Sequence, residues 1–182
     1  MAPETIAFVR NLMPYRDCAG VALFNRQGRV FIGRRRKGED PEKGPESGAP
    51  WQMPQGGIDK GEDALEAARR ELFEETNVRS IELIKEAPGW ITYDLPDQLL
   101  GTALKGKYRG QRQRWFAFLF TGEESEIDVK SPGGGQFHAE FDAWRWEDLE
   151  RTPDLIVDFK REAYREVVAA FADVPQRVGR RA

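Results

Sequence analysis

Three glutamates that could bind a metal ion are crowded into one short run of the chain, RRELFEET. Glu71 and Glu75 are four residues apart and Glu74 is three from Glu71, so on a helix their like charges would share one face. They would also lie toward the C-terminal end of that helix, where the helix dipole favours cations. A hard divalent cation such as Mg²⁺, which takes oxygen ligands and is commonly shared with a substrate phosphate, would offset this repulsion. The alternative is a solvated acidic face that pairs with Arg69 and Arg70.

The flanking residues predict the helix that would carry these acids. Residues 57–61 have the composition of a loop, Glu62 and Asp63 are acids suited to a first helical turn, and Asn77 can adopt the left-handed conformation that ends a helix. One apolar stripe of the helix should face a core: Leu65, Ala68 and Leu72. Glu75 lies at the edge of this stripe, so we expect its carboxylate to be partly buried.

The spacing of these residues resembles the Nudix box, G-x5-E-x7-R-E-U-x-E-E-x-G-U, in which U is an apolar residue. Here Gly56 is followed after five residues by Glu62, and after seven more by RELFEETNV, which begins at Arg70. Every fixed position matches except the last glycine, where Asn77 tolerates the same backbone conformation. A match at so many positions is a strong signal. Arg70 and Glu62 are best interpreted as a structural pair that ties the loop to the helix.

The resemblance extends well beyond this box, from about Tyr15 to Phe171. It is carried by YRDCAGVALFN, WQMPQGGID, KYRGQRQRWFAFLFTG, EFDAWRW and FKREAY. Together these segments resemble the bacterial RNA pyrophosphohydrolase branch of the Nudix superfamily, which is also described as dinucleoside polyphosphate hydrolase. The resemblance implies an α/β Nudix fold, a mixed β-sheet held between helices, in one domain at residues 15–173. Residues 1–14 would then be an arm or a short helix, and residues 174–182 a disordered tail.

The resemblance also implies which residues hold metal and act in catalysis. Members of the family hydrolyse a nucleoside diphosphate linked to another group, by attack of water on phosphorus. The implied metal ligands are the carbonyl of Gly56 and four carboxylates: Glu71, Glu74, Glu75 and Glu140. Of these, Glu74 and Glu140 are the candidates for a direct catalytic role, and Glu140 could take the proton from water. The alternative for Glu140 is an ordinary acid in a loop.

A second set of residues is implied to bind substrate. Arg35 and Phe159 match positions that hold the terminal base between a guanidinium plane and a ring, although Phe159 could equally pack in the core. Four basic residues are candidates for phosphate contacts: Arg16, Arg112, Arg114 and Lys160. The alternative for the last three is a solvated surface role.

Composition excludes several other classes of protein. With 182 residues and a formal net charge of −3, the chain has the size of one domain and no overall attraction to nucleic acid or membrane. Its one cysteine, Cys18, excludes an intrachain disulfide and favours a reducing cytoplasm, and we expect no signal peptide or membrane span. The single histidine, His138, stands outside any nucleophile motif. The scarcity of thiolate and imidazole groups argues against a dedicated zinc site.

The remaining pattern predicts the other elements of the domain. Apolar and polar residues and turn signals predict strands at residues 19–25, 29–36, 81–87, 90–95, 114–121 and 141–146. The first two strands should form a hairpin. Three segments should be loops or connections: 37–50, 96–110 and 131–136. Thr152 should cap one closing helix whose apolar face extends to Phe171.

Two enzymatic functions share the implied site and remain open. The first is removal of pyrophosphate from the 5′-triphosphate end of RNA, which leaves a 5′-monophosphate. The second is cleavage of dinucleoside polyphosphates such as diadenosine tetraphosphate. A nucleotide sensor without activity would usually have a broken box, whereas all the acids are present here, and cleansing of oxidised nucleotides is not favoured by the extended similarity. For either enzyme we expect Mg²⁺, with Mn²⁺ or Zn²⁺ as substitutes, and neither a membrane nor an obligate protein partner.

Overall fold

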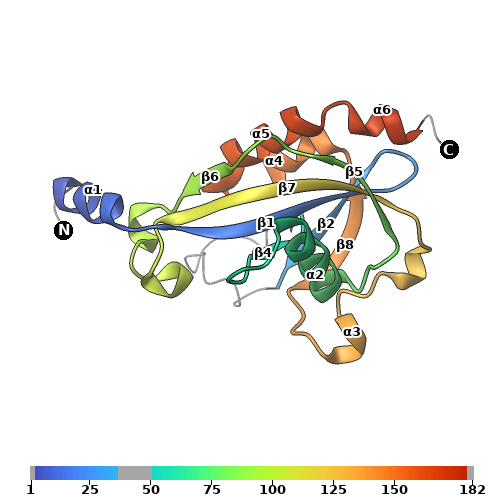
Figure 1. Ribbon diagram of the computed structural model, residues 1–182, viewed down its shortest axis with the longest axis horizontal. Coiled ribbons are helices and arrows are strands. Elements are labelled where there is room, and N and C mark those ends of the chain that lie inside the picture. The colour runs from blue at the N-terminus through green and yellow to red at the C-terminus, as the bar shows by residue number, and fades with distance from the viewer. Residues whose placement is uncertain (1–2, 37–50, 180–182) are drawn as a thin grey trace.

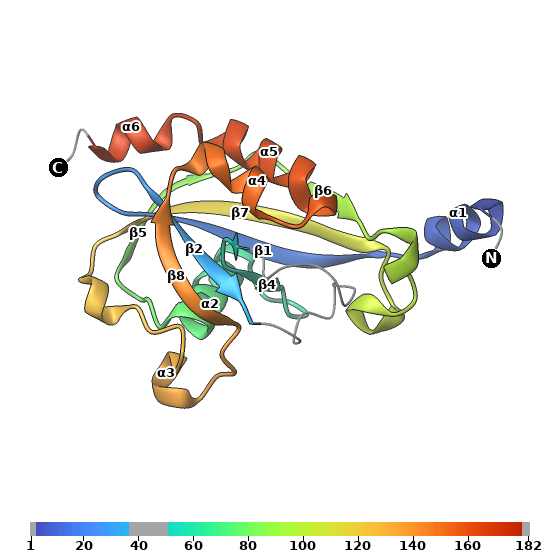
Figure 2. The ribbon, with the colours of Figure 1, turned by 180° about the vertical axis from the view of Figure 1, so that it is seen from behind.

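A mixed β-sheet with helices on both faces organises the chain (Figures 1 and 2). The computed structural model describes residues 3–36 and 51–179. The strands are β1 (Tyr15–Phe24), β2 (Val30–Arg35), β3 (Trp51–Gln52), β4 (Gln55–Gly57), β5 (Ile81–Glu86), β6 (Ile91–Asp94), β7 (Gly110–Phe120) and β8 (Phe141–Glu147). The helices are α1 (Pro3–Leu12), α2 (Ala64–Thr76), α3 (Pro132–Gly135), α4 (Thr152–Leu155), α5 (Arg161–Phe171) and α6 (Val174–Gly179). Short 3₁₀ turns are η1 (Asp97–Leu99), η2 (Ala103–Gly106), η3 (Glu124–Glu126), η4 (Leu149–Arg151) and η5 (Asp158–Lys160). The expected α/β class is confirmed.

The two longest strands, β1 and β7, run parallel at the centre of the sheet. The whole of β1 pairs residue by residue with residues 110–119. β2 and β4 pair with β1, β3 and β8 pair with β2, and β5 and β6 pair with β7, all in the antiparallel sense. The predicted hairpin is present, because Phe24 of β1 pairs with Val30 of β2. From Cys18 onward β1 is buried throughout, as expected of a strand that is covered on both faces.

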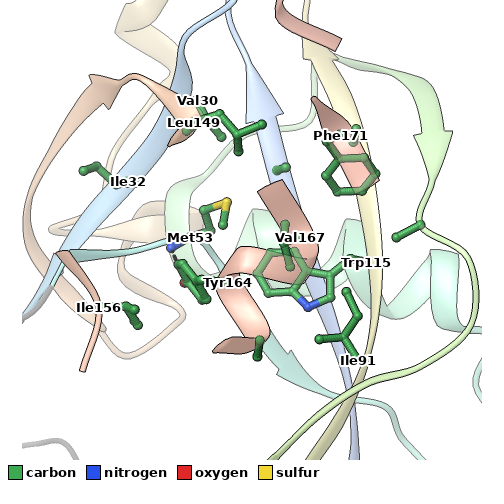
Figure 3. Close-up of a cluster of buried hydrophobic side chains, with 14 of the residues drawn as sticks. Val30, Ile32, Met53, Ile91, Trp115, Leu149, Ile156, Tyr164, Val167 and Phe171 are labelled. Carbon is green, nitrogen blue, oxygen red and sulfur yellow. Dashed lines mark hydrogen bonds between the residues drawn. The ribbon is translucent and has the colours of Figure 1, made fainter. Parts of the chain in front are cut away.

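Each face of the sheet has its own hydrophobic core. The core beneath α4, α5 and α6 contains Trp115 and Tyr164, whose rings meet edge to face at 5.8 Å (Figure 3). The core beneath α2 contains Leu72 and Phe118. Gly20 of β1 makes room for the first core, since a Cβ at this position would lie 2.5 Å from the Trp115 indole. The central strands therefore hold α2 and α5 at fixed positions on opposite faces.

The central strands begin earlier than the sequence pattern predicts. β1 begins at Tyr15 rather than at residue 19, and β7 begins at Gly110 rather than at residue 114. The added residues are polar, and they extend the ladder because they pair with each other. Asp17 stands opposite Arg112, and the Arg112 guanidinium donates two hydrogen bonds to the Asp17 carboxylate, at 2.5 and 3.0 Å. A polar run that pairs across strands in this way gives no alternation signal in the sequence.

The expected single closing helix is wrong. α4 ends at Leu155, and the chain is extended at Ile156, with φ −85° and ψ 162°, before η5 and α5 follow. Thr152 caps neither segment, because its hydroxyl donates to the carbonyl of Leu149 at 2.8 Å. Ile156 is itself buried, so burial of its side chain accompanies the break between the helices.

The expected disordered tail is also wrong over most of its length. Residues 174–179 form α6, and its Val174 and Val178 are buried in the same core as α5. Residues 180–182, like the predicted loop at residues 37–50, lie outside the described residues. The predicted loop at 131–136 is a tight turn, α3, with Gly133 and Gly134 in the left-handed region.

At the other end of the chain, the segment expected to be an arm or a short helix forms α1, which projects beyond the end of the sheet (Figure 1). Arg10 anchors it, because the guanidinium donates to the carbonyl of Leu95 at 2.7 Å and to the carboxylate of Asp97 at 2.5 Å. Throughout the part of the chain that the structure describes, the helices are too short or too polar to cross a membrane.

The helix α2 ends where its flanking residues predict but begins later, because Glu62 and Asp63, expected in its first turn, both precede Ala64. Asp63 is the N-cap, and its carboxylate accepts the backbone N–H groups of Leu65 and Glu66 at 2.9 and 3.2 Å. Asn77 is the C-cap, with φ 67°, and its N–H donates to the carbonyl of Phe73. The expected apolar stripe faces the sheet, with Leu72 fully buried.

Arg70 ties the preceding loop to α2. Its guanidinium donates two 2.8 Å hydrogen bonds to the two carboxylate oxygens of Glu62 and a third, also 2.8 Å, to the carbonyl of Gly57. Glu62 in turn accepts the N–H of Asp59 at 2.9 Å. The expected structural pair is therefore formed. Hydrogen bonds from Arg70 lower the pKa of Glu62 to about 2.

We predict that Glu62→Gln destabilises the protein at neutral pH, by roughly 2 kcal/mol, because a charged bidentate pair is lost. The folded-state pKa of Glu62 lies below its usual value of 4.5. The stabilisation is therefore complete above about pH 4.5 and is lost as the pH falls toward about 2. Urea unfolding across this pH range measures the free energy of unfolding of the wild type and of the variant. The difference between the two free energies should shrink toward zero as the pH falls. A difference that stays constant with pH would contradict the assignment. Glu66→Gln is the matched control, since Glu66 is exposed and its pair with Arg69 is 3.7 Å long.

Candidate functional site

Strand β4 and helix α2 bring a backbone glycine against the acidic run. β4 is held in place by β1, with Gly56 paired to Ala19 and Gly57 to Cys18. A Cβ at Gly56 would lie 2.0 Å from the Cδ atom of Glu71, so no other residue fits there without moving this carboxylate. The Gly56 backbone and the Glu71 carboxylate are thus in close approach.

Glu75 is the most deeply placed of the acids. Its side chain is buried and 5% exposed, and it accepts the N–H of Gln55 at 3.3 Å. Burial raises the pKa of Glu75 well above its usual range, and the nearby charges of Glu71 and Glu140 raise it further. The expected partial burial of this carboxylate is confirmed. A buried acid among other acids is poorly stabilised as an anion unless a cation joins it.

Arginine contacts hold the neighbouring acids. Arg70 donates to Glu71 at 2.7 Å, and the same nitrogen lies 3.5 Å from Glu74. Burial raises the pKa of Glu71, whereas the charges of Arg70 and, more weakly, Arg16 oppose this rise. We call the carboxylates of Glu71, Glu74 and Glu75 the acidic row. The side chain of Glu74 is about twice as exposed as that of Glu71 (30% against 14%), so Glu74 lies on the outer side of this row.

The acid from outside the box reaches the same cluster. Glu140 precedes β8, and its carboxylate accepts a 2.6 Å hydrogen bond from Arg35 at the end of β2. The β2–β8 ladder shifts register between Arg34 and Arg35, and the N–H of Arg36 donates to the carbonyl of Glu140 at 3.2 Å. These contacts fix Glu140 where its charge acts on Glu75.

The donor set fits a hard divalent cation. It consists of carboxylate oxygens and a glycine backbone, with no sulfur and no imidazole, which suits Mg²⁺ or Mn²⁺ rather than a zinc site of thiolate and imidazole ligands. Within the described residues, no three carboxylates, imidazoles or thiols are grouped closely enough for one ion. Arg70 and Arg35 account for this spacing, because they bind Glu71 and Glu140. Ion binding would therefore require these carboxylates to reorient.

The candidate base-binding residues belong to two clusters. Arg35 is grouped with the acids through Glu140, whereas the ring of Phe159 packs against Tyr93, with centroids 5.7 Å apart. The alternative of a solvated surface role for Lys160 is wrong, because this residue is buried. Its Nζ lies 5.2 Å from the centroid of the Tyr93 ring. Tyr93 therefore joins Phe159 and Lys160, a role that its place in an alternating strand did not reveal.

Arg112 and Arg114 of β7 form ion pairs with acids of the neighbouring strands β1 and β5. Arg112 binds Asp17 and Arg114 binds Glu86, and both guanidinium groups lie near the Trp90 ring, 4.6 and 5.6 Å from its centroid. These contacts give both arginines a structural role between strands. Arg16 differs, because its guanidinium lies over Gly57, 2.5 Å from where a Cβ would be.

A chain of buried amides supports the acidic row, and sequence reasoning missed it. The side-chain amide of Gln113 donates to the side chains of Gln55 and Gln111 at 2.7 and 2.9 Å, and its carbonyl accepts the indole N–H of Trp115 at 2.9 Å. Because the backbone N–H of Gln55 binds Glu75, this chain links the acid to the core. The sequence signal that could have revealed this chain is the alternation in GQRQRW, which turns both glutamines of β7 to the same face of the sheet.

Comparison with known proteins identifies the family of this chain. A family model of the NUDIX domain matches residues 14–168. A protein named RNA pyrophosphohydrolase from Rhizobium meliloti (strain 1021) is 59% identical over 162 residues, which cover 88% of this chain and 95% of that protein. One of the same name from Bradyrhizobium sp. (strain ORS 278) is 57% identical over 160 residues, 88% of this chain and 94% of that protein. The structure of the E. coli dihydroneopterin triphosphate pyrophosphohydrolase shares the fold, with a TM-score of 0.59 and 22% identity over 86% of this chain and 98% of that one. The chain therefore belongs to the Nudix family.

Proposed function

We propose that this protein removes pyrophosphate from the 5′-triphosphate end of RNA and leaves a 5′-monophosphate. The observation that supports the proposal most strongly is the high identity, over nearly the whole chain, to proteins named RNA pyrophosphohydrolase. The buried acidic row is consistent with it, because hydrolysis of a phosphoanhydride requires neutralisation of phosphate charge. We place the activity in the cytoplasm, with the RNA end as substrate and no obligate protein partner.

Nudix hydrolases need divalent cations, and we propose Mg²⁺ as the ion here, with Mn²⁺ or Zn²⁺ as substitutes. The residues that would hold it are the Gly56 carbonyl and the carboxylates of Glu71, Glu74, Glu75 and Glu140. When bound, the metal would neutralise phosphate charge and lower the pKa of a water molecule.

Glu74 and Glu140 are the proposed proton acceptors for the attacking water. Glu74 is the most exposed of the three clustered acids of α2, and Glu140 approaches from a different element, so the two could act from different sides of the phosphate. Glu75, by contrast, is enclosed by protein and is suited to binding charge rather than to exchanging protons with solvent.

The substrate would extend from the acids toward Arg35 and Phe159. Glu140 holds the Arg35 guanidinium, and a planar guanidinium can stack on a base while it keeps an in-plane hydrogen bond. Phe159 is half-buried against Tyr93, so its ring offers a fixed surface. Lys160 is buried beside the same rings, so its positive charge would contribute to the local potential rather than through an exposed phosphate contact.

We predict that activity depends completely on a divalent cation. Turnover of triphosphorylated RNA should cease in chelator and return when Mg²⁺ or Mn²⁺ is added back. The thermal midpoint of the chelated protein should also rise with the ion, because binding to the folded state alone is stabilising. Full turnover in chelator would contradict the proposed role of the acids.

We predict that Glu75→Gln lowers kcat by about 100-fold or more, since the variant keeps the shape of the side chain but loses its charge. Its thermal midpoint in chelator should stay equal to that of the wild type or rise, because the substitution removes a poorly stabilised buried charge. Glu140→Ala should also lower kcat, and Glu66→Gln is the exposed control on the same helix. A folded Glu75→Gln variant with normal kcat would mean that this carboxylate is not part of the reaction.

We predict that a 5′-triphosphate end with a few unpaired nucleotides is a good substrate and a fully paired end a poor one. A paired base must unstack before it can lie between Arg35 and Phe159, which costs a few kcal/mol. Values of kcat/KM for single-stranded and blunt duplex ends at fixed salt, with diadenosine tetraphosphate in parallel, provide the test. Equal rates on the two RNA ends would exclude the base sandwich. Cleavage of diadenosine tetraphosphate, without cleavage of either RNA end, would show that dinucleoside polyphosphates are the substrates.

A further inference from the structure

A cavity of about 800 Å³ opens beside the acidic row, at Gly57. Its walls come from the start of β1, from the loop between β4 and α2, and from the connection that contains η2. The residues on which its chemistry depends are four cations and two rings: Arg16, Lys60, Lys105, Lys107, Tyr15 and Tyr108. A volume of this size is typical of small-molecule sites.

The charge of this cavity is positive and largely uncompensated. Lys60, Lys105 and Lys107 are exposed, and no carboxylate of the described residues forms a salt bridge with any of them. The two acids in the lining face arginines instead: Asp17 binds Arg112, and Asp59 lies 4.0 Å from Arg70. The lysines are therefore available to an anion from solution.

An unusual turn fixes the lysines at the cavity. Leu104, Lys105 and Gly106 have φ values of 51°, 60° and 68°, so three successive residues adopt the left-handed conformation, which is unfavourable for the first two. Leu104 is buried in the core beneath α4, α5 and α6, and this burial holds the turn in place. Strained turns of this kind are found at ligand clamps, where surrounding structure maintains them.

The cavity lies at the Glu71 end of the acidic row, and Arg35 lies beyond Glu75, at the other end. Along β4, the N–H of Gln55 contacts Glu75, Gly56 faces Glu71, and Gly57 lies beneath Arg16. Glu140 and Arg35 act on the charge of Glu75, whereas Arg16 acts on that of Glu71. A nucleotide whose base lies near Arg35 would cross the acids and direct its distal phosphates into the cavity.

We propose that this cavity is the leaving-group site, in which Arg16, Lys60, Lys105 and Lys107 bind the two phosphates that depart as pyrophosphate. The inference rests on the proposed function and assigns one end of its substrate. The cavity is larger than pyrophosphate, so the ion would enter with water and counter-ions. Attraction by several lysines accounts for binding of a small, highly charged product without a close fit.

The double variant Lys105→Gln/Lys107→Gln tests the assignment against a control that removes the same charge. Arg26→Gln/Lys130→Gln is that control, because both residues are exposed and neither lines the cavity. Calorimetry at fixed free Mg²⁺ would measure binding of pyrophosphate and of 5′-monophosphorylated RNA to each protein. We expect the Kd of pyrophosphate to rise roughly tenfold in the cavity variant only, with the Kd of the RNA unchanged.

Three results would overturn the assignment. Pyrophosphate could bind the cavity variant as tightly as the wild type, or fail to bind the wild type at all. Alternatively, the cavity variant could lose affinity for monophosphorylated RNA rather than for pyrophosphate, which would mean that the cavity follows the RNA backbone. The proposed function is judged separately, by whether the wild type cleaves triphosphorylated RNA. Unchanged thermal midpoints of both variants would show that the fold is kept.

Discussion

Burial of the Glu75 carboxylate is the constraint on which the rest of the site depends. A charge removed from water costs several kcal/mol unless partners repay it. Within the described residues, the hydrogen-bond donor to Glu75 is the backbone N–H of Gln55, and two further carboxylates raise the pKa of Glu75. The nearby arginines are bound to Glu71 and Glu140 rather than to Glu75. The anionic form of Glu75 is therefore poorly stabilised in the folded chain, and a divalent cation would stabilise it.

Such a row can persist only on a rigid support, and the two central strands provide it. β1 holds β4, so that Gly56 stays against Glu71, and β7 supplies the glutamines that link Glu75 to the core. Arg70 joins the loop to the helix through Glu62 and Gly57. Packing on both faces of the sheet supplies the stability that offsets the unfavourable electrostatics of the site.

The helix and its acids could be predicted from sequence because their signals are local. Asp63 and Asn77 mark the ends of α2, and the misplaced charges of Glu71 and Glu75 indicate a site. Features that depend on distant partners could not be predicted. In the sequence, Asp17 is an ordinary polar residue, and only the strand pairing shows that Arg112 lies opposite it.

The same reason explains the errors in the C-terminal part of the chain. Val174 and Val178 occur in a segment with many polar residues, and only the core that buries them makes this segment a helix. The break at Ile156 likewise depends on packing rather than on a proline or glycine. For Lys160, residue type suggests a phosphate contact or a solvated role, and neither predicts its burial beside the rings of Tyr93 and Phe159.

The most direct test of the buried acidic row is a crystal structure of the wild-type protein grown with Mn²⁺, with the ion located by anomalous scattering. The account predicts a peak about 2.0–2.3 Å from oxygens of Glu75 and from the carbonyl of Gly56. It also predicts that Glu71 or Glu140 turns away from its arginine to join the ion. A structure with Mn²⁺ bound elsewhere, and with Glu75 protonated and without a metal contact, would contradict it.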